Sequence, residues 1–216
     1  MKKTKKHLWI GIALLLAFVL WTVLVRFVDV RAIGPQDSQV GFAFLNGAAH
    51  RFLGVHMTLY IITDFAGLVP VAFMLGFAIL GLAEWIGRKR LCRVDRDLLL
   101  LGGFYILVLA AYLFFEAVPI NHRPVLIEGV LEVSYPSSTT LLVLTVMPTA
   151  QMRLSARIGR PVPRRLVSAA ILLFTVLTVI GRLLSGVHWL TDIIGGALLS
   201  ASLVALYSAC VTAKDI

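Results

Sequence analysis

Six long apolar segments limit this chain to a small set of folds. They lie at about residues 8–28, 65–86, 98–119, 139–152, 166–184 and 193–211. A helix needs about 20 apolar residues to cross the hydrocarbon core of a bilayer, and only helices and closed barrels satisfy their backbone hydrogen bonds in lipid. We therefore predict an all-α, polytopic membrane protein with six transmembrane helices in one domain, residues 1–216. The segment at 139–152 is short for a span, so we expect its helix either to begin inside the membrane boundary or to use residues 135–138 as its entry.

The distribution of charge predicts the orientation of these helices. Only 14% of the residues are charged, against about 25% in soluble domains. Most of the 20 Lys and Arg residues fall in segments that share one side of the membrane if the N-terminus is cytoplasmic, as the positive-inside rule requires. Both termini are then cytoplasmic. The net charge of +9 reflects topology and contact with anionic lipid heads, and we expect no nucleic-acid partner.

The longest outside segment contains an expected surface helix. Residues 41–60 mix apolar side chains with Asn46, His50, Arg51 and His56, a pattern typical of an amphipathic helix that lies in the membrane interface. We expect an interfacial segment at about 37–60 that guides a lipid toward a site. A simple packing connector is the alternative interpretation.

Arg182, His188 and Asp192 form the most informative polar group of the chain. They lie between the last two apolar segments, where polar residues are costly and usually functional. His188 and Asp192 are four positions apart, on one face of any helix that contains both. An Asp that accepts a hydrogen bond from one imidazole nitrogen leaves the other free to attack an electrophile, and arginine suits phosphate. Alternatively, these residues are a helix-start aspartate, a snorkelling arginine and an interfacial histidine.

A second outside loop adds further groups suited to phosphate. Arg123 precedes a proline, and Ser137 and Ser138 follow another at an expected helix start, where hydroxyls cap free N–H groups and anions are favoured. We predict that Arg123, Arg182, Ser137 and Ser138 bind a phosphate group at the outer face. The acidic residues are scattered, whereas Mg²⁺ prefers clustered oxygens, so we expect no metal.

These residues resemble the motifs of the type 2 phosphatidic acid phosphatase family, which are membrane lipid phosphatases. Arg182, His188 and Asp192 match the third motif, in which five residues separate Arg from His and three separate His from Asp. Arg123 and Pro124 match the Arg-Pro that ends the first motif. The six apolar segments and the order of the motifs also agree with the family.

The chain departs from the family pattern at four positions. Glu116 stands in place of the first-motif Lys, Ser138 and Thr139 replace the Gly and His of the second motif, and Gly181 replaces the Ser that opens the third. In the family, the second-motif His is the general acid that protonates the leaving group. The first and second motifs are therefore degenerate here, while the third is nearly complete.

The resemblance implies a metal-independent phosphatase without a cofactor. His188 would attack phosphorus and form a phosphohistidine, and Asp192 would orient and stabilise the imidazole. Arg123 and Arg182 would hold the non-bridging oxygens, with help from Ser137 and the backbone N–H of Ser138. Water would then hydrolyse the phosphohistidine.

The altered second motif bears on the substrate. Thr139 cannot donate a proton near neutral pH, and loss of a general acid costs about 10²–10⁴-fold. A phosphate that leaves from a diphosphate has a pKa of only about 6–7 and tolerates this loss best. We therefore favour a polyprenyl diphosphate, such as the undecaprenyl carrier. Phosphatidic acid and phosphatidylglycerol phosphate are the alternative substrates.

Other possibilities stay open at this point. Another residue could replace the missing acid, and the candidates are Glu116, His122, Glu128 and Glu132. A carboxyl group near a phosphate has a raised pKa and can donate a proton. The chain could also be a lipid phosphotransferase or a catalytically silent relative that binds lipid phosphate. The sequence leaves the oligomeric state open.

Overall fold

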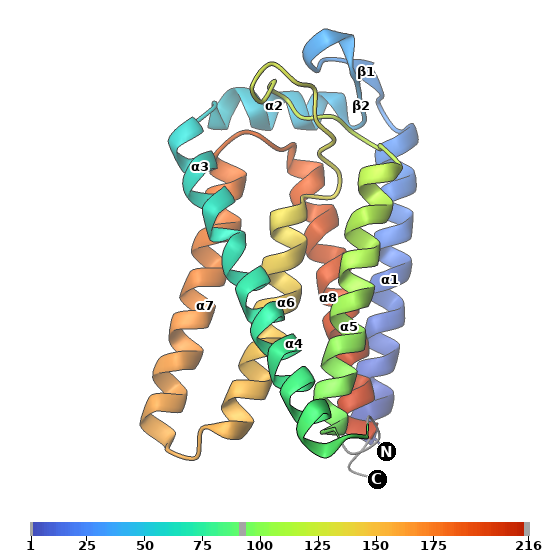
Figure 1. The fold of residues 1–216 in the computed structure, drawn as a ribbon. Coiled ribbons are helices and arrows are strands. Elements are labelled where there is room, and N and C mark those ends of the chain that lie inside the picture. The colour runs from blue at the N-terminus through green and yellow to red at the C-terminus, as the bar shows by residue number, and fades with distance from the viewer. Residues whose placement is uncertain (1, 91–93, 214–216) are drawn as a thin grey trace.

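The chain folds into a bundle of long helices, one end of which is covered by a short helix and a loop (Figure 1). The computed structural model describes residues 2–90 and 94–213. In chain order its elements are α1 (Lys2–Phe27), β1 (Arg31–Ala32), η1 (Pro35–Asp37), β2 (Gln39–Val40), α2 (Ala43–Leu53), α3 (Met57–Ala66), α4 (Leu68–Arg88), α5 (Arg96–Ala117), α6 (Ser138–Arg157), α7 (Pro161–Leu184) and α8 (Leu190–Thr212). The two short strands pair antiparallel, with Arg31 opposite Val40.

In the part of the chain that the structure describes, five helical stretches are long and apolar enough to cross a membrane. They are Lys2–Phe27, Met57–Arg88, Arg96–Ala117, Pro161–Leu184 and Leu190–Thr212. Many of their large apolar side chains are exposed, among them Leu16 at 65% and Ile79 at 66%, which suits contact with lipid rather than water. The all-helical fold is thus confirmed, and the described residues contain five candidate spans where the sequence predicted six.

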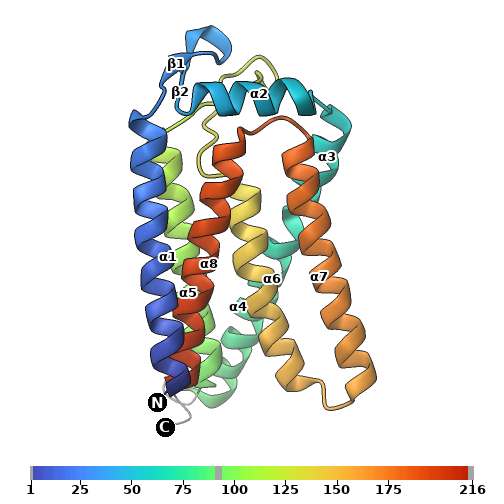
Figure 2. The ribbon, with the colours of Figure 1, turned by 180° about the vertical axis from the view of Figure 1, so that it is seen from behind.

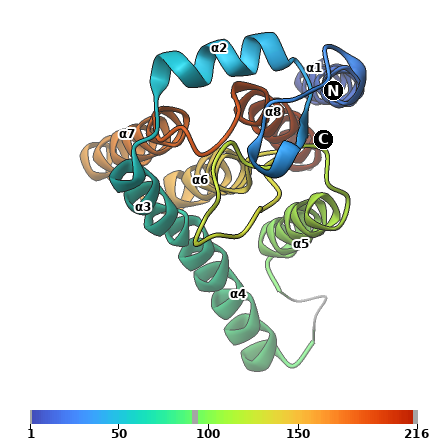
Figure 3. The ribbon, with the colours of Figure 1, turned by 90° about the horizontal axis from the view of Figure 1, so that it is seen from above.

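The remaining predicted span corresponds to α6, which differs from the prediction in length and surroundings. It has 20 residues, because the helix continues to Arg157 instead of ending near residue 152. It lies in the middle of the bundle when the molecule is viewed from above (Figure 3), and Leu141, Val143 and Val146 are fully buried. A helix surrounded by other helices has little contact with lipid, so its residues can be more polar than those of a helix that faces lipid. Accordingly, α6 carries buried threonines such as Thr145, whose hydroxyl donates to the carbonyl of Leu141.

Helices α1 and α8, the first and last of the bundle, pack closely side by side. The Ser202 hydroxyl donates to the carbonyl oxygen of Gly11 at 2.9 Å, and a Cβ atom at Gly11 would lie only 2.7 Å from the Leu206 side chain. Helix α1 begins, and α8 ends, at the end of the bundle opposite to α2 (Figure 2).

The segment expected as one surface helix at 41–60 is instead two helices. Helix α2 lies across the end of the bundle and exposes Phe44 (74%) and Phe52 (88%). It stops at Gly54, whose φ of 71° suits glycine. The chain then turns, the backbone N–H of His56 donates to the Ser185 carbonyl, and α3 runs into the bundle almost in line with α4. Residues 57–60 therefore form the first turn of α3 and are not part of α2.

Candidate functional site

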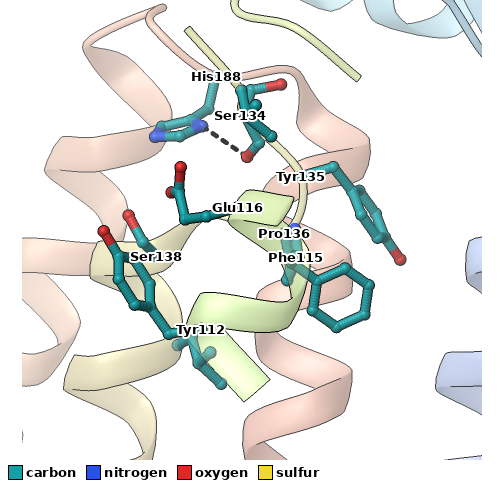
Figure 4. Close-up of a pocket in the computed structure, with 10 residues that line it drawn as sticks. Tyr112, Phe115, Glu116, Ser134, Tyr135, Pro136, Ser138 and His188 are labelled. Atoms are coloured by element: carbon teal, nitrogen blue, oxygen red, sulfur yellow. Dashed lines mark hydrogen bonds between the residues drawn. The ribbon is translucent and has the colours of Figure 1, made fainter. Parts of the chain in front are cut away.

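His188 lies in the link between α7 and α8, beneath the loop that joins α5 to α6. The residue is 4% exposed, and its Nδ1 atom is 3.2 Å from the carbonyl oxygen of Ser134 (Figure 4). A carbonyl can only accept a hydrogen bond, so Nδ1 carries the proton and Nε2 carries the lone pair. Within the described part of the chain, Nε2 is buried and has no hydrogen-bond partner. This nitrogen is therefore available as a nucleophile.

Asp192 occupies the first turn of α8 and is fully buried. Its Oδ2 atom accepts a hydrogen bond from the backbone N–H of Trp189 at 2.9 Å, and its Oδ1 atom accepts one from the Asn121 side chain at 3.2 Å. Oδ2 lies 3.7 Å from His188 Nδ1, which is too long for a hydrogen bond. Asp192 thus caps the helix, as one interpretation of the sequence held. It also places a carboxylate beside the imidazole, while Ser134 takes the direct hydrogen bond.

Arg123 and Arg182 are both buried, at 7% and 1% exposure. The Arg182 side chain therefore does not snorkel to the surface. Arg123 Nε lies 2.9 Å from Glu132 Oε2, and Arg182 Nη1 lies 3.4 Å from Asp64 Oδ1. Among the residues described, Arg123 Nη1 and Arg182 Nε are buried without a hydrogen-bond partner. Buried N–H groups are rarely left unpaired, and two in one site indicate a place for an anion.

The arginines and the imidazole influence each other electrostatically. Burial lowers the pKa of His188 well below its ordinary value, and the positive charges of Arg182 and Arg123 lower it further. The hydrogen bond to Ser134 opposes this shift but does not reverse it. His188 is consequently neutral near pH 7, which is the protonation state that a nucleophile needs.

The residues at the start of α6 have separate tasks. Ser137 is fully buried and caps the helix, since its hydroxyl oxygen accepts hydrogen bonds from the Thr140 backbone N–H at 3.5 Å and from the Thr140 hydroxyl at 3.0 Å. Its backbone N–H donates to the Asp192 carbonyl at 3.1 Å. Ser138 is half-buried and faces the same space as His188. Thr139 is 6% exposed and lies against Gly67, at the junction of α3 and α4.

A small recess separates His188 from the end of α5. Glu116, Ser138, Tyr112 and His188 are among the residues that line it, and the Glu116 carboxylate points toward the imidazole (Figure 4). Its volume is about 10 Å³, enough for about one water molecule.

The other candidate acids lie elsewhere in the described structure. Glu132 pairs with Arg123, and Glu128 is exposed in a tight turn with a φ of 51°. His122 is half-buried, and its carbonyl oxygen accepts a hydrogen bond from Trp189 Nε1 at 2.7 Å. Of the four candidates, Glu116 is the one that the described residues place on the recess wall. In residues 2–90 and 94–213, no three His, Cys, Asp or Glu residues are grouped as metal ligands.

Sequence reasoning missed three residues that shape the site. They are Ser134, through its carbonyl oxygen; Asn121, through its bond to Asp192; and Tyr60, whose ring is 5.6 Å from Arg123 Cζ and 5.0 Å from Arg182 Cζ. Every residue has a backbone carbonyl group, so the residue type at position 134 does not indicate the contact with His188. Tyr60 was missed because it was assigned to a surface helix. Of the three, only Asn121 could have been suspected from the sequence, because it is a polar residue two positions before Arg123.

The fold and the site define a bundle of apolar helices in which two buried arginines act on a buried imidazole, whose Nε2 atom has no hydrogen-bond partner among the described residues. The chain belongs to the PAP2 superfamily, whose family model matches residues 101–216, and this confirms the resemblance drawn from the motifs. Members of the superfamily are phosphatases.

A solved structure supports the same fold. The chain is similar to the "first transmembrane PAP2 type phosphatidylglycerolphosphate phosphatase from Bacillus subtilis", with a TM-score of 0.59 and 20% sequence identity. The similarity covers 96% of this chain and 98% of that one. No curated protein matched the chain in sequence.

Proposed function

We propose that this chain is a metal-independent lipid phosphatase that works through a phosphohistidine on His188. The observation that carries the proposal is a buried Nε2 atom and two buried arginine N–H groups that have no partner among the described residues, with both arginines close enough to act on the imidazole electrostatically. A neutral imidazole with its lone pair on Nε2 can attack phosphorus while Arg123 and Arg182 hold the non-bridging oxygens. The leaving group then departs, and water cleaves the phosphohistidine to release inorganic phosphate.

Asp192 has an electrostatic task in this mechanism. When Nε2 bonds to phosphorus, the ring becomes positively charged, and a carboxylate 3.7 Å from Nδ1 stabilises that charge. The Ser134 carbonyl keeps the proton on Nδ1 throughout. Ser138 remains a proposed phosphate contact. Ser137 contributes by setting the start of α6, because its hydroxyl is buried in the cap.

The proposed topology has six spans, both termini in the cytoplasm and the site on the extracytoplasmic side of a cell membrane. Helix α6 serves as the sixth span, since it runs alongside the five apolar stretches. The first residues of α1 and the last residues of α8 lie at one end of the bundle, and the α7–α8 link that carries His188 lies at the other end. Lys2, Lys3, Lys5 and Lys6 begin α1 at the end proposed to be cytoplasmic. Arg93 and Lys214, which the charge pattern also places there, lie outside the described residues.

The favoured substrate is a polyprenyl diphosphate. The family's acid position is filled by Thr139, which lies against Gly67 and has no proton to give near neutral pH. A phosphate leaving group suffers least from this change. Phosphatidic acid and phosphatidylglycerol phosphate are the alternative substrates, and a phosphotransferase or a silent lipid-phosphate-binding relative are the alternative activities.

A phosphate-release panel tests the activity and the substrate together. Purified protein with EDTA is given phosphatidic acid, phosphatidylglycerol phosphate, and polyprenyl mono- and diphosphate. We expect release, fastest from the diphosphate, and none from His188→Ala, while His56→Ala, an exposed histidine at the same end, stays active. Acid-labile ³²P on the wild-type protein would reveal the phosphohistidine. Loss of activity in EDTA, or faster cleavage of phosphatidic acid, would contradict the metal-free mechanism or the substrate, respectively.

A further inference from the structure

We propose that one face of α3, formed by Tyr60, Thr63 and Asp64, positions the two arginines of the site. This inference rests on the proposed function, because it takes Arg123 and Arg182 to be the phosphate-binding groups. The three residues are spaced i, i+3 and i+4 and share one side of the helix. They lie outside residues 101–216, which match the family model.

Tyr60 contacts both guanidinium groups with a single ring. Arg182 Cζ is 5.0 Å and Arg123 Cζ is 5.6 Å from its centroid, within the range of a cation–π interaction. Two buried cations in one site repel each other strongly when little water separates them. The negative electrostatic potential over the ring face offsets part of that repulsion and keeps the two arginines in one place before a phosphate arrives.

Thr63 and Asp64 orient Arg182 further. The Thr63 hydroxyl donates to the Leu59 carbonyl at 2.8 Å, which leaves its lone pairs to accept from Arg182 Nη1 at 3.5 Å. Asp64 Oδ1 lies 3.4 Å from the same Nη1 atom. Both contacts engage one edge of the guanidinium group, and Nε stays without a partner among the described residues. The face of α3 therefore leaves Nε for the substrate.

Gly181 explains how α3 comes so near to α7. A Cβ atom at this position would lie 2.8 Å from Thr63 Cγ2, closer than side-chain atoms pack. The residue stands where the family pattern has Ser, next to Arg182 in the sequence. The absence of a side chain at position 181 therefore allows Thr63 to come close enough to contact Arg182.

The first test separates the ring of Tyr60 from its hydroxyl group. The probe is inorganic phosphate, and its affinity is measured by calorimetry on the His188→Ala protein, which removes turnover. We expect Tyr60→Leu to weaken binding about tenfold, the scale of a desolvated cation–π contact, and Tyr60→Phe to bind like its parent. Equal binding by Tyr60→Leu, or an equal loss in both variants, would overturn the role of the ring. Thermal melts of both variants show whether the fold is intact.

The second test uses the contact between α7 and α3. We expect Gly181→Ala to weaken phosphate binding and raise KM more than it lowers kcat, because it pushes Thr63 away from Arg182. Thr63→Ser removes Cγ2 but keeps the hydroxyl, so the double variant should recover the affinity. A Gly181→Ala protein that binds normally, or one that Thr63→Ser does not rescue, contradicts the proposal.

Arg182→Ala distinguishes this inference from the proposed function. It should abolish phosphate binding. If Arg182→Ala binds phosphate as the parent does, the phosphate site itself is wrong. If Arg182→Ala loses binding while Tyr60→Leu and Gly181→Ala do not, only the role of α3 fails.

Discussion

The Nδ1 atom of His188 donates a hydrogen bond to the carbonyl oxygen of Ser134, 54 positions earlier in the chain and 3.2 Å away. Asp192, four residues after His188, lies farther off at 3.7 Å. The tautomer of the imidazole is therefore set by the loop between α5 and α6 and not by the neighbouring helix alone. That loop also carries Arg123, so the same segment prepares the nucleophile and one phosphate-binding group.

The first prediction concerns pH. Burial and the two arginines lower the pKa of His188, so it should titrate below the ordinary histidine value of about 6.5. The unfolded chain takes up a proton at about pH 6.5, whereas the folded protein does so only at lower pH. Stability from this group is thus present above pH 6.5 and declines as the pH falls below it.

NMR of ¹⁵N-histidine-labelled protein in detergent checks this directly, with His188→Ala used to assign the signal. The expected spectrum at pH 7 shows the Nδ1–H tautomer, and the midpoint lies below 6.5. A proton on Nε2, or a midpoint at or above 6.5, would be inconsistent with the buried site.

The second prediction concerns Asn121, which donates to Asp192 at 3.2 Å and accepts from the Gly41 N–H at 3.4 Å. Asn121→Leu removes the partner of Asp192 Oδ1 and of the Gly41 N–H, and each lost bond should lower the free energy of unfolding by about 1–3 kcal/mol. We expect kcat/KM to drop about tenfold or more. In Asn121→Asp, a second carboxylate faces Asp192, and two such neighbours do not both ionise readily.

The pH profile distinguishes orientation of Asp192 from general support of the fold. For Asn121→Asp, the acid limb of kcat should move to higher pH than in the wild type. A profile that keeps its shape and only loses height would mean that Asn121 merely stabilises the loop.

The third prediction concerns Glu116, which lines the recess with His188 and Ser138. A carboxyl group there can assist a basic leaving group but has little to add for a phosphate leaving group. Glu116→Gln should therefore slow hydrolysis of phosphatidic acid about 10²-fold or more, while polyprenyl diphosphate is little affected. Rates for both lipids are compared with those of Glu128→Gln, an exposed control. Equal slowing of both substrates would exclude a general acid role.

The fourth prediction concerns packing under the site. A Cβ atom at Gly195 would lie 2.6 Å from the ring of Tyr135, whose hydroxyl is 2.7 Å from Thr22 Oγ1. The ring cannot easily yield, so Gly195→Ala should destabilise the protein by about 1–3 kcal/mol, seen as a lower Tm in detergent. In Gly103→Ala, the added atom meets none of the described atoms within 4 Å, and the Tm should hold or rise because Ala favours the helix.

Several features of the fold and the site were predictable because they are local. Apolar segments of about 20 residues predict membrane helices whatever they pack against, and the spacing of Arg182, His188 and Asp192 belongs to the chain itself. The prediction was less accurate at α6, which is longer and more polar than a lipid-facing span. Residues 41–60 form two helices because the chain turns at Gly54 to meet the α7–α8 link, and no local pattern shows that contact.

Composition and residue spacing were enough to establish the class of protein, the family motifs and the side chains available for chemistry. Which atoms of those side chains are free or bonded depends on the packing of the helices. Ser134 reaches His188 across 54 positions, and Thr63 reaches Arg182 across 119. Burial and hydrogen bonding depend on neighbours that are distant in the chain. The state of the Nε2 atom and the ion pairs of Arg123 and Arg182 are therefore set only when the helices pack together.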